Sequence, residues 1–169
     1  MEELPTHGGS LRIYAAHREY GQICMRNAVR TLLTREQDFG LEDIQSYASF
    51  SKKIQKIKLD TLRQLSEWKQ SGKRVAAFGA AAKGNTFLNY CGIKNDLIDF
   101  VVDSNPHKQG LYLPGSLIPI VGREALWEYK PDYLLILPWN LRDEIVKAAG
   151  SIREWGGQFV VCIPRLDVF

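Results

Sequence analysis

Lys83 follows a short apolar segment in a run of very small residues. Positions 74–86 read Arg-Val-Ala-Ala-Phe-Gly-Ala-Ala-Ala-Lys-Gly-Asn-Thr, so the apolar segment ends at Gly79 and a helix can open at the Asn-Thr pair. Small residues let backbone N–H groups approach a ligand, a helix N-terminus adds a partial positive charge, and a lysine adds a full one. The pattern predicts an anion site formed by Lys83, Gly84, Asn85 and Thr86.

The ligand is not named by this segment alone. It is neither a Walker A motif nor the GxGxxG dinucleotide fingerprint. Its alternative interpretation is a tight strand-to-helix turn packed on alanines. The anion site is the preferred interpretation, because Lys83 would otherwise place a charge in an alanine-rich loop.

A second candidate segment spans 102–110, Val-Asp-Ser-Asn-Pro-His-Lys-Gln-Gly. Asp103 ends an apolar stretch about twenty residues beyond Lys83, a spacing at which dinucleotide folds place an acidic residue on a ribose hydroxyl. Alternatively, Asp103 and Asn105 stabilise the turn through side-chain-to-backbone hydrogen bonds. His107 and Lys108 either reach a phosphate or are solvated. Both interpretations stay open.

The third segment is Leu137-Pro138-Trp139-Asn140. Trp139 follows a buried strand, where an indole can stack on a base or a sugar. Asn140 is a natural N-cap for a helix that begins at Leu141. The alternative is a plain cap with an aromatic plug, but the functional interpretation gains if this segment converges with the Lys83 segment on one crevice.

The acid/base chemistry of the sequence is sparse. No Ser-His-Asp order, paired carboxylates or Cys/His metal spacing is apparent, and His7, beside Gly8-Gly9-Ser10, is the one obvious acid/base candidate. Cys91 and Cys162 are expected to be small core residues. We predict a binding domain with no catalytic residue and no metal ligand.

Strand and helix patterns alternate in the second half of the chain. Continuous apolar strands joined by helices indicate a parallel sheet covered on both faces. The predicted fold is α/β, a Rossmann-like, doubly wound, mostly parallel sheet. In such a sheet ligands bind beyond the carboxyl ends of the strands, where the topology changes direction. The predicted strands are 75–78, 97–102, 118–121, 133–137 and 159–163, and the predicted helices are 86–91, 123–129 and 141–155.

The first seventy residues have a different pattern. Apolar residues at three- and four-residue spacing predict a long helix over 41–71, ended by Gly72. Before it, 11–16 is predicted as a strand without a partner strand, 20–33 as a helix and 34–40 as a polar linker. We expect residues 1–38 to be the remnant of another domain plus a linker, and 39–169 to be the C-terminal domain.

The bulk composition limits the partners. The 169 residues carry a net charge of +3, too small for the dense basic stripe that nucleic-acid binding needs. No apolar run reaches transmembrane length, and cysteine usage favours a reducing cytoplasm. We therefore expect a cytoplasmic protein that binds neither nucleic acid nor membrane. Lys52, Lys53, Lys56 and Lys58 are predicted to form a solvated helix face.

These residues resemble the C-terminal domain of the S-adenosylmethionine-dependent sugar C-methyltransferase family, whose members act on nucleotide-linked deoxysugars. The similarity runs from the Pro-Thr-His-Gly-Gly-Ser-Leu-Arg segment at 5–12 to the end of the chain. Its most specific parts are 79–86, 102–110 and 136–140.

The resemblance implies a whole enzyme of three parts: a zinc-binding N-terminal region, a methyltransferase domain and this Rossmann-like domain. S-adenosylmethionine and zinc are accordingly expected only in the full-length enzyme, and this chain alone is expected to be inactive. In that enzyme the carbon next to a 4-keto group would be deprotonated, and the enolate would attack the methyl group of the donor.

The resemblance gives this chain the role of holding the nucleotide diphosphate, with the upstream methyltransferase domain as its partner. The alternative is a structural or dimerisation module without a ligand. A self-sufficient dinucleotide-dependent enzyme is disfavoured by the missing GxGxxG and acid/base pair. The expected substrate-binding residues are Lys83, Gly84, Asn85, Thr86, Asp103, His107, Lys108, Trp139 and Asn140.

Overall fold

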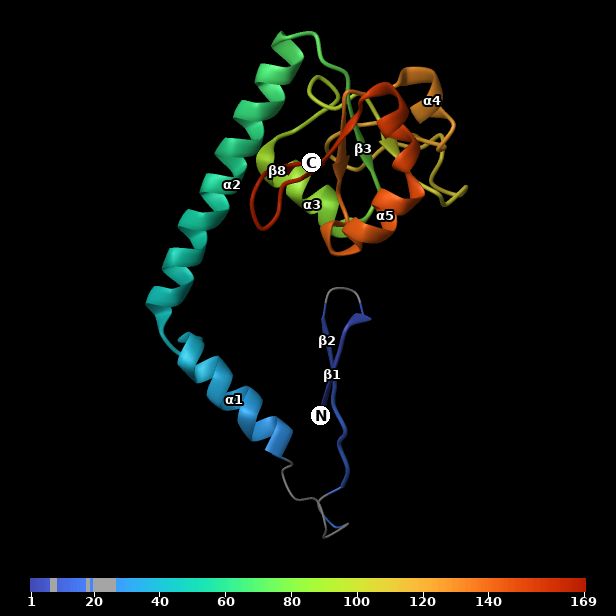
Figure 1. Cartoon of the computed structure of the whole chain (residues 1–169). Coiled ribbons are helices and arrows are strands. Elements are labelled where there is room, and N and C mark those ends of the chain that lie inside the picture. Colours follow the sequence, from blue (N-terminus) through green and yellow to red (C-terminus); the bar gives the residue numbers. More distant parts are fainter. Residues whose placement is uncertain (7–8, 18, 20–26) are drawn as a thin grey trace. The chain divides into compact units, whose positions relative to one another are not determined.

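The computed structural model describes residues 1–6, 9–17, 19 and 27–169, and it divides into two compact units. One unit spans Met1–Lys53 and the other Ile54–Phe169 (Figure 1). Helix α2 (Ile44–Gln70) crosses the boundary between them. Among the described helices, none combines the length and the apolar character needed to cross a bilayer.

The first unit contains a small hairpin and helical segments. Strands β1 (Glu2–Leu4) and β2 (Ser10–Arg12) pair antiparallel, so the expected strand without a partner was wrong: it is shorter and has a neighbour. Helix α1 (Asn27–Phe39) continues through the segment that we interpreted as a linker. Because α1 buries none of its residues, its polar second half is a solvated helix rather than a break between elements. Residues 20–26 of the predicted first helix lie outside the described part.

The second unit is built on a six-stranded sheet of order β5-β4-β3-β6-β7-β8. The first five strands in this order are parallel and β8 is antiparallel to β7, which confirms the predicted α/β fold. From β3 the chain moves to β4 and β5 on one side, and then returns to β6 and β7 on the other. The strands are β3 (Val75–Phe78), β4 (Val101–Val102), β5 (Ile120–Val121), β6 (Tyr133–Ile136), β7 (Gln158–Val161) and β8 (Asp167–Val168).

Helices cover both faces of this sheet (Figure 1). Alternate residues of β3 point to opposite faces, so Val75 and Ala77 join one apolar cluster while Ala76 and Phe78 join the other. The first cluster includes residues of α2 and α3, and the second includes residues of α4, α5 and η4. The helices are α3 (Ala82–Cys91), α4 (Ala125–Tyr129), α5 (Arg142–Ala148) and the 3₁₀ segments η3 (Trp139–Leu141) and η4 (Gly150–Trp155).

The second half of α2 packs on the first of these faces. Leu65 and Trp68 are buried, and the Trp68 indole stacks on the ring of Tyr133 with centroids 3.8 Å apart. Its first half differs, because Ile44 and Phe50 are 74% and 60% exposed. The amphipathic pattern along the helix is therefore used for packing only from about Thr61 onwards.

Several predicted elements needed correction. Helix α3 starts at Ala82 instead of Thr86, so Lys83 to Thr86 lie on the helix rather than in a loop. The predicted helix 141–155 is broken at Ala149 into α5 and η4. Residues 164–166 are not a tail, since the chain turns there and adds strand β8. Each correction concerns one or two turns of chain, where local sequence signals are weakest.

Candidate functional site

The topology changes direction between β3 and β6, which are hydrogen-bonded neighbours. Two of the three predicted segments follow the carboxyl ends of these two strands. The ammonium group of Lys83, on α3, donates a hydrogen bond to the Asn140 side-chain oxygen, on η3. The same ammonium lies 5.0 Å from the centroid of the Trp139 ring. The structure thus brings Lys83, Trp139 and Asn140 together at the switch point, where open α/β sheets bind ligands.

Two glycines allow this close approach. A side chain at Gly79 would place its Cβ 2.6 Å from two ring carbons of Pro138, and Gly79 has a φ of +91°. A Cβ on Gly84 would lie 2.6 Å from that of Leu137. The turn after β3 and the first turn of α3 therefore press against the end of β6. Gly84, predicted for a phosphate, has a packing role here.

The N-terminus of α3 presents backbone donors. The first N–H groups of a helix have no acceptor within the helix, and here the N-cap residue, Ala81, offers no capping side chain. The N–H of Asn85 is already bonded to the Ala81 carbonyl. The first-turn donors therefore belong to Ala82, Lys83 and Gly84, because the helix begins at Ala82 and not at Thr86 as predicted.

The side chains of Asn85 and Thr86 are used within α3. The Asn85 oxygen accepts from the side-chain amide of Asn89, and the Thr86 hydroxyl donates to the Ala82 carbonyl. Both groups therefore support the helix in the described structure. Their proposed contacts to a ligand remain a prediction.

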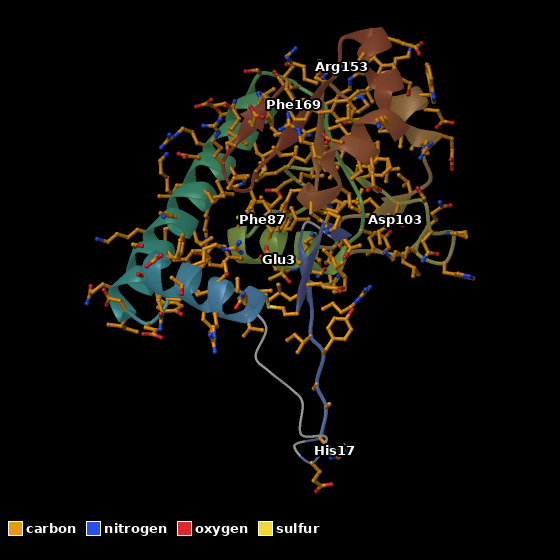
Figure 2. The ribbon with its side chains drawn as sticks, turned by 60° about the horizontal axis from the view of Figure 1, so that its bottom comes forward. Glu3, His17, Phe87, Asp103, Arg153 and Phe169 are labelled. Atoms are coloured by element: carbon orange, nitrogen blue, oxygen red, sulfur yellow. The ribbon has the colours of Figure 1, made fainter. Side chains whose placement is uncertain are left out.

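Asp103 stabilises the loop that leads into α3. It follows β4 on the segment labelled in Figure 2, and its carboxylate accepts hydrogen bonds from the Ala80 N–H at 2.8 Å and the Asn105 N–H at 2.8 Å. The ammonium of Lys108 lies 3.4 Å from the same carboxylate and donates to the Ala80 carbonyl at 2.8 Å. These bonds correspond to the turn-stabilising alternative for Asp103.

The rest of this loop faces solvent. The Asn105 side chain accepts from the N–H of His107, and the imidazole of His107 is exposed. Lys108 is turned back onto Ala80 and Asp103. The loop therefore holds the backbone at Ala80, just before α3, in place. Among the described residues, no hydrogen bond connects this loop to Lys83, Trp139 or Asn140.

Asn140 is not the helix cap that we expected. It lies inside η3, whose N-cap is Pro138, and neither η3 nor α5 has a side-chain cap. Its oxygen is the acceptor for Lys83, 57 positions away in sequence, and this non-local bond replaces the local one. Asn140 therefore connects two elements instead of starting one.

Trp139 borders two hollows at this edge of the sheet. One, of about 260 Å³, also involves Arg142, Arg165 and Asp167. The other, of about 300 Å³, lies along 139–144. Sequence reasoning missed Arg142, Arg165 and Asp167. Arg165 lies in the turn between β7 and β8, and the antiparallel pairing of β8 places Asp167 beside Val161, at the carboxyl end of β7. The one signal in the sequence was Pro164, directly before Arg165, because proline is common in turns.

The cysteines of this unit have no reactive character. Cys91 and Cys162 are buried in the core, as predicted. Burial raises the pKa of the Cys91 thiol to about 11 and that of Cys162 to about 12. In the described ranges, no three His, Cys, Asp or Glu side chains gather as metal ligands. His7, the acid/base candidate, lies outside the described residues.

The described site suits binding more than chemistry. It combines a lysine, a helix N-terminus, an amide and an indole, and groups of these kinds are suited to an anion attached to a planar group. The sheet order and the position of these side chains at the switch point define a domain of the doubly wound α/β class.

Comparison with known proteins identifies the family. Residues 5–164 match the family model of the C-methyltransferase C-terminal domain, and the chain belongs to that family. It is 35% identical over 160 residues to the C-methyltransferase NovU of Streptomyces niveus. That match covers 95% of this chain and 38% of NovU, so the chain spans well under half the length of its relative. The resemblance inferred from the sequence is thereby confirmed at the level of the family.

Proposed function

We propose that this domain binds a nucleotide-linked keto-deoxysugar and positions it for methylation by an upstream catalytic domain. The observation that carries the proposal is the hydrogen bond from Lys83 to Asn140 across the topological switch point, beside the open N-terminus of α3. A diphosphate that enters this site would meet the Lys83 ammonium and the first N–H groups of the helix.

Trp139 supports the proposal from the opposite strand. An indole beside a lysine offers an apolar surface next to a positive charge, which suits a nucleotide with its base or sugar on the ring. Asp103 and Lys108 would act indirectly by holding the turn at Ala80 in place. His107, Asn85 and Thr86 would line the outer part of the site.

The methyl donor does not fit this site. S-adenosylmethionine carries a positive sulfonium, which the Lys83 ammonium would repel. Zinc likewise lacks a set of three ligands among the described residues. The donor, the metal and the base that forms the enolate would therefore belong to the upstream part of a full-length enzyme.

The contribution of this domain to the reaction would be orientation. Holding a diphosphate handle fixes the position of a sugar carbon several bonds away, and orientation of this kind is a large source of rate enhancement. The site needs no acid or base for that task. This agrees with a group made of neutral and cationic side chains.

The direct test is titration of the chain with thymidine diphosphate, followed by calorimetry or by amide chemical shifts. Lys83→Ala removes a charge-assisted contact and should weaken binding about tenfold, equivalent to about 1.4 kcal/mol. Lys94→Ala is the matched control, because Lys94 is an exposed lysine that follows the other end of α3. Absence of binding at millimolar nucleotide, or equal weakening by both variants, would contradict the proposal.

A structural module without a ligand is the second candidate. The exposed apolar side chains of Ile44 and Phe50 on α2, and of Phe39 on α1, favour it because such residues usually pack on something. It predicts that Lys83→Ala leaves the affinity of a full-length enzyme for its sugar nucleotide unchanged. The same variant tested in both proteins therefore separates the two candidates.

A further inference from the structure

The first half of α2 carries an exposed apolar stripe. Ile44, Tyr47 and Phe50 recur at three-residue spacing, which places them along one side of the helix. Their side chains are 74%, 53% and 60% exposed. Leu65, five helical turns beyond Tyr47 on the same side, is buried, so the pattern that packs the second half of α2 continues here without such packing. The stripe belongs to the first unit, which does not contain the Lys83 site.

The two ends of the stripe carry charges of opposite sign. Glu42 and Asp43 precede it and form its acidic end, while Lys52 and Lys53 follow it and form its basic end. Between Asp43 and Lys52 the chain has no charged side chain. Within the part of the chain that the structure describes, none of these four side chains takes part in an ion pair. Both ends can therefore pair with a charged partner.

The turn between α1 and α2 holds the acidic end in place. The N–H of Asp43 donates to the Gly40 carbonyl at 3.0 Å. The Asp43 carboxylate accepts from the N–H of Gln45 at 2.9 Å, which caps α2. The Tyr47 hydroxyl donates to the Leu41 carbonyl at 2.7 Å. The stripe and its acidic end are thus arranged before a partner binds, which lowers the entropic cost of association.

The order of these groups is symmetric about Tyr47. Ile44 and Phe50 are each three residues from it in sequence, and Glu42 and Lys52 are each five residues from it. A twofold axis through Tyr47 would place a second copy of the helix antiparallel to the first, with Ile44 of one copy on Phe50 of the other. The acidic end of each copy would then meet the basic end of the other. A parallel pair would instead bring like charges together.

We propose that this stripe is a self-association surface, on which two copies of the chain pair antiparallel about a twofold axis at Tyr47. The apolar side chains form the centre of the interface and the charged ends its rim. Lys53 lies about 120° around the helix from Tyr47, at the flank of the stripe, from which its long side chain reaches the partner. An interface of this size is small, so we expect a dissociation constant on the order of 10 µM. The proposal does not depend on nucleotide binding.

The first test measures the mass of the whole chain against its concentration by analytical ultracentrifugation. The wild type should pass from monomer to dimer, and Phe50→Ser should weaken association at least about tenfold. Leu59→Ser is the matched control, because Leu59 is also 60% exposed on α2 but lies two and a half turns from Phe50, on the opposite side. It should leave association unchanged. A wild type that stays monomeric up to millimolar concentration, or equal weakening by both variants, would overturn the proposal.

The second test exchanges the charges at the ends of the stripe. Lys52→Glu with Lys53→Glu makes both ends acidic. Glu42→Lys with Asp43→Asn makes both ends basic and keeps a residue that can cap α2. Each double variant alone should lose association at least about tenfold, because like charges then meet at both ends of the dimer. An equimolar mixture of the two should recover it, since every acidic end then meets a basic one.

The outcomes identify the arrangement of the two copies. Loss in each double variant, recovery in the mixture and weakening by salt support the antiparallel pair, because exposed ion pairs are screened. A parallel pair would already hold like charges together in the wild type, so neither double variant alone would weaken it. Association that only Phe50→Ser weakens would therefore overturn the antiparallel arrangement. A monomeric wild type would leave the stripe to another partner, such as an upstream domain of a longer protein.

Discussion

The two ends of the same sheet use charge in different ways. At the amino ends, the Asp132 carboxylate accepts from the backbone N–H of Arg74 at 2.8 Å and from Lys73 at 3.3 Å. Asp99 accepts from Lys69 at 2.9 Å and from the N–H of Val75 at 3.2 Å. At the carboxyl ends of β3 and β6, by contrast, the partners that the described chain gives Lys83 are an amide and an indole ring.

This difference separates charge that stabilises the fold from charge that is available to a ligand. Lys69 and Lys73 each face a carboxylate within the fold, so their charges are neutralised where they stand. A neutral amide orients Lys83 without cancelling its charge. The carboxyl ends also contain two internal pairs, Asp103 with Lys108 and Arg142 with Asp167, and the first of these pairs fixes the backbone at Ala80. In the described chain, the charges of Lys69 and Lys73 at the amino ends are thus paired with carboxylates, while Lys83 at the carboxyl ends contacts neutral groups.

The backbone at the carboxyl ends should tolerate change least. Gly79→Ala forces a side chain into a φ of +91° and into contact with the Pro138 ring at 2.6 Å, so we expect a loss of about 3 kcal/mol in unfolding free energy. Gly72→Ala, before the amino end of β3, has a φ of +70° but open space around it, and should lose only about 1 kcal/mol. Urea denaturation of both variants measures the difference. Equal losses would mean that the approach of Gly79 to Pro138 contributes nothing.

The amino ends should depend on pH through Asp132. Burial raises the pKa of this carboxyl, but the Arg74 N–H and the positive charges of Lys73 and Arg74 outweigh it and hold the pKa below its ordinary value. Because the pKa of Asp132 is lower in the folded than in the unfolded state, the carboxylate stabilises the fold at pH values above its ordinary pKa of about 4. This stabilisation is lost as the pH falls through the pKa of the folded state.

Asp132→Asn should therefore lower the unfolding free energy by about 1.5 kcal/mol at pH 7. The difference from the wild type should shrink as the pH falls below about 4, because the wild-type carboxyl is then protonated as well. Urea denaturation at a series of pH values measures it, with nucleotide binding at pH 7 as the control that should not change. A difference that stays constant down to pH 2 would rule out the ionic contribution.

The central strands of the sheet were predicted correctly because their residues form clear apolar runs. Residues 75–78 and 133–136 are short apolar runs buried on both faces, and continuous runs of this kind are typical of parallel strands. Strand β8 was missed because it has only two residues, one of them Asp167, and therefore shows no apolar run. It forms only because the chain turns after β7 and pairs back along it. The polar second half of α1 was mistaken for a linker for a related reason: a solvated helix has little apolar pattern to detect.

The site was predicted in part, for similar reasons. Lys83, Trp139 and Asn140 each follow a central strand of the sheet, so the switch-point rule places them together from the order of strands along the chain. The rule does not say what the side chains bond to. Asn140 is a strong cap by local preference, yet it accepts a hydrogen bond from Lys83 instead. Asp167 lies at the same edge because β8 pairs antiparallel with β7. Local signals fail where a distant segment competes for the same group.

A matched pair of lysines gives the sharpest and smallest test of the comparison. Lys69→Met removes the partner of Asp99, a pair whose side chains are each 26% exposed, and should lower the unfolding free energy by about 1 kcal/mol without changing nucleotide affinity. Lys83→Met removes a bond to a partly exposed amide and should cost no more than about 0.5 kcal/mol, yet weaken nucleotide binding. Urea denaturation and nucleotide titration of both variants measure the unfolding free energy and the nucleotide affinity for each of these two equivalent substitutions. If Lys83→Met proved the more destabilising and left affinity unchanged, the charge at the switch point would belong to the fold, and the two ends of the sheet would use charge in the same way.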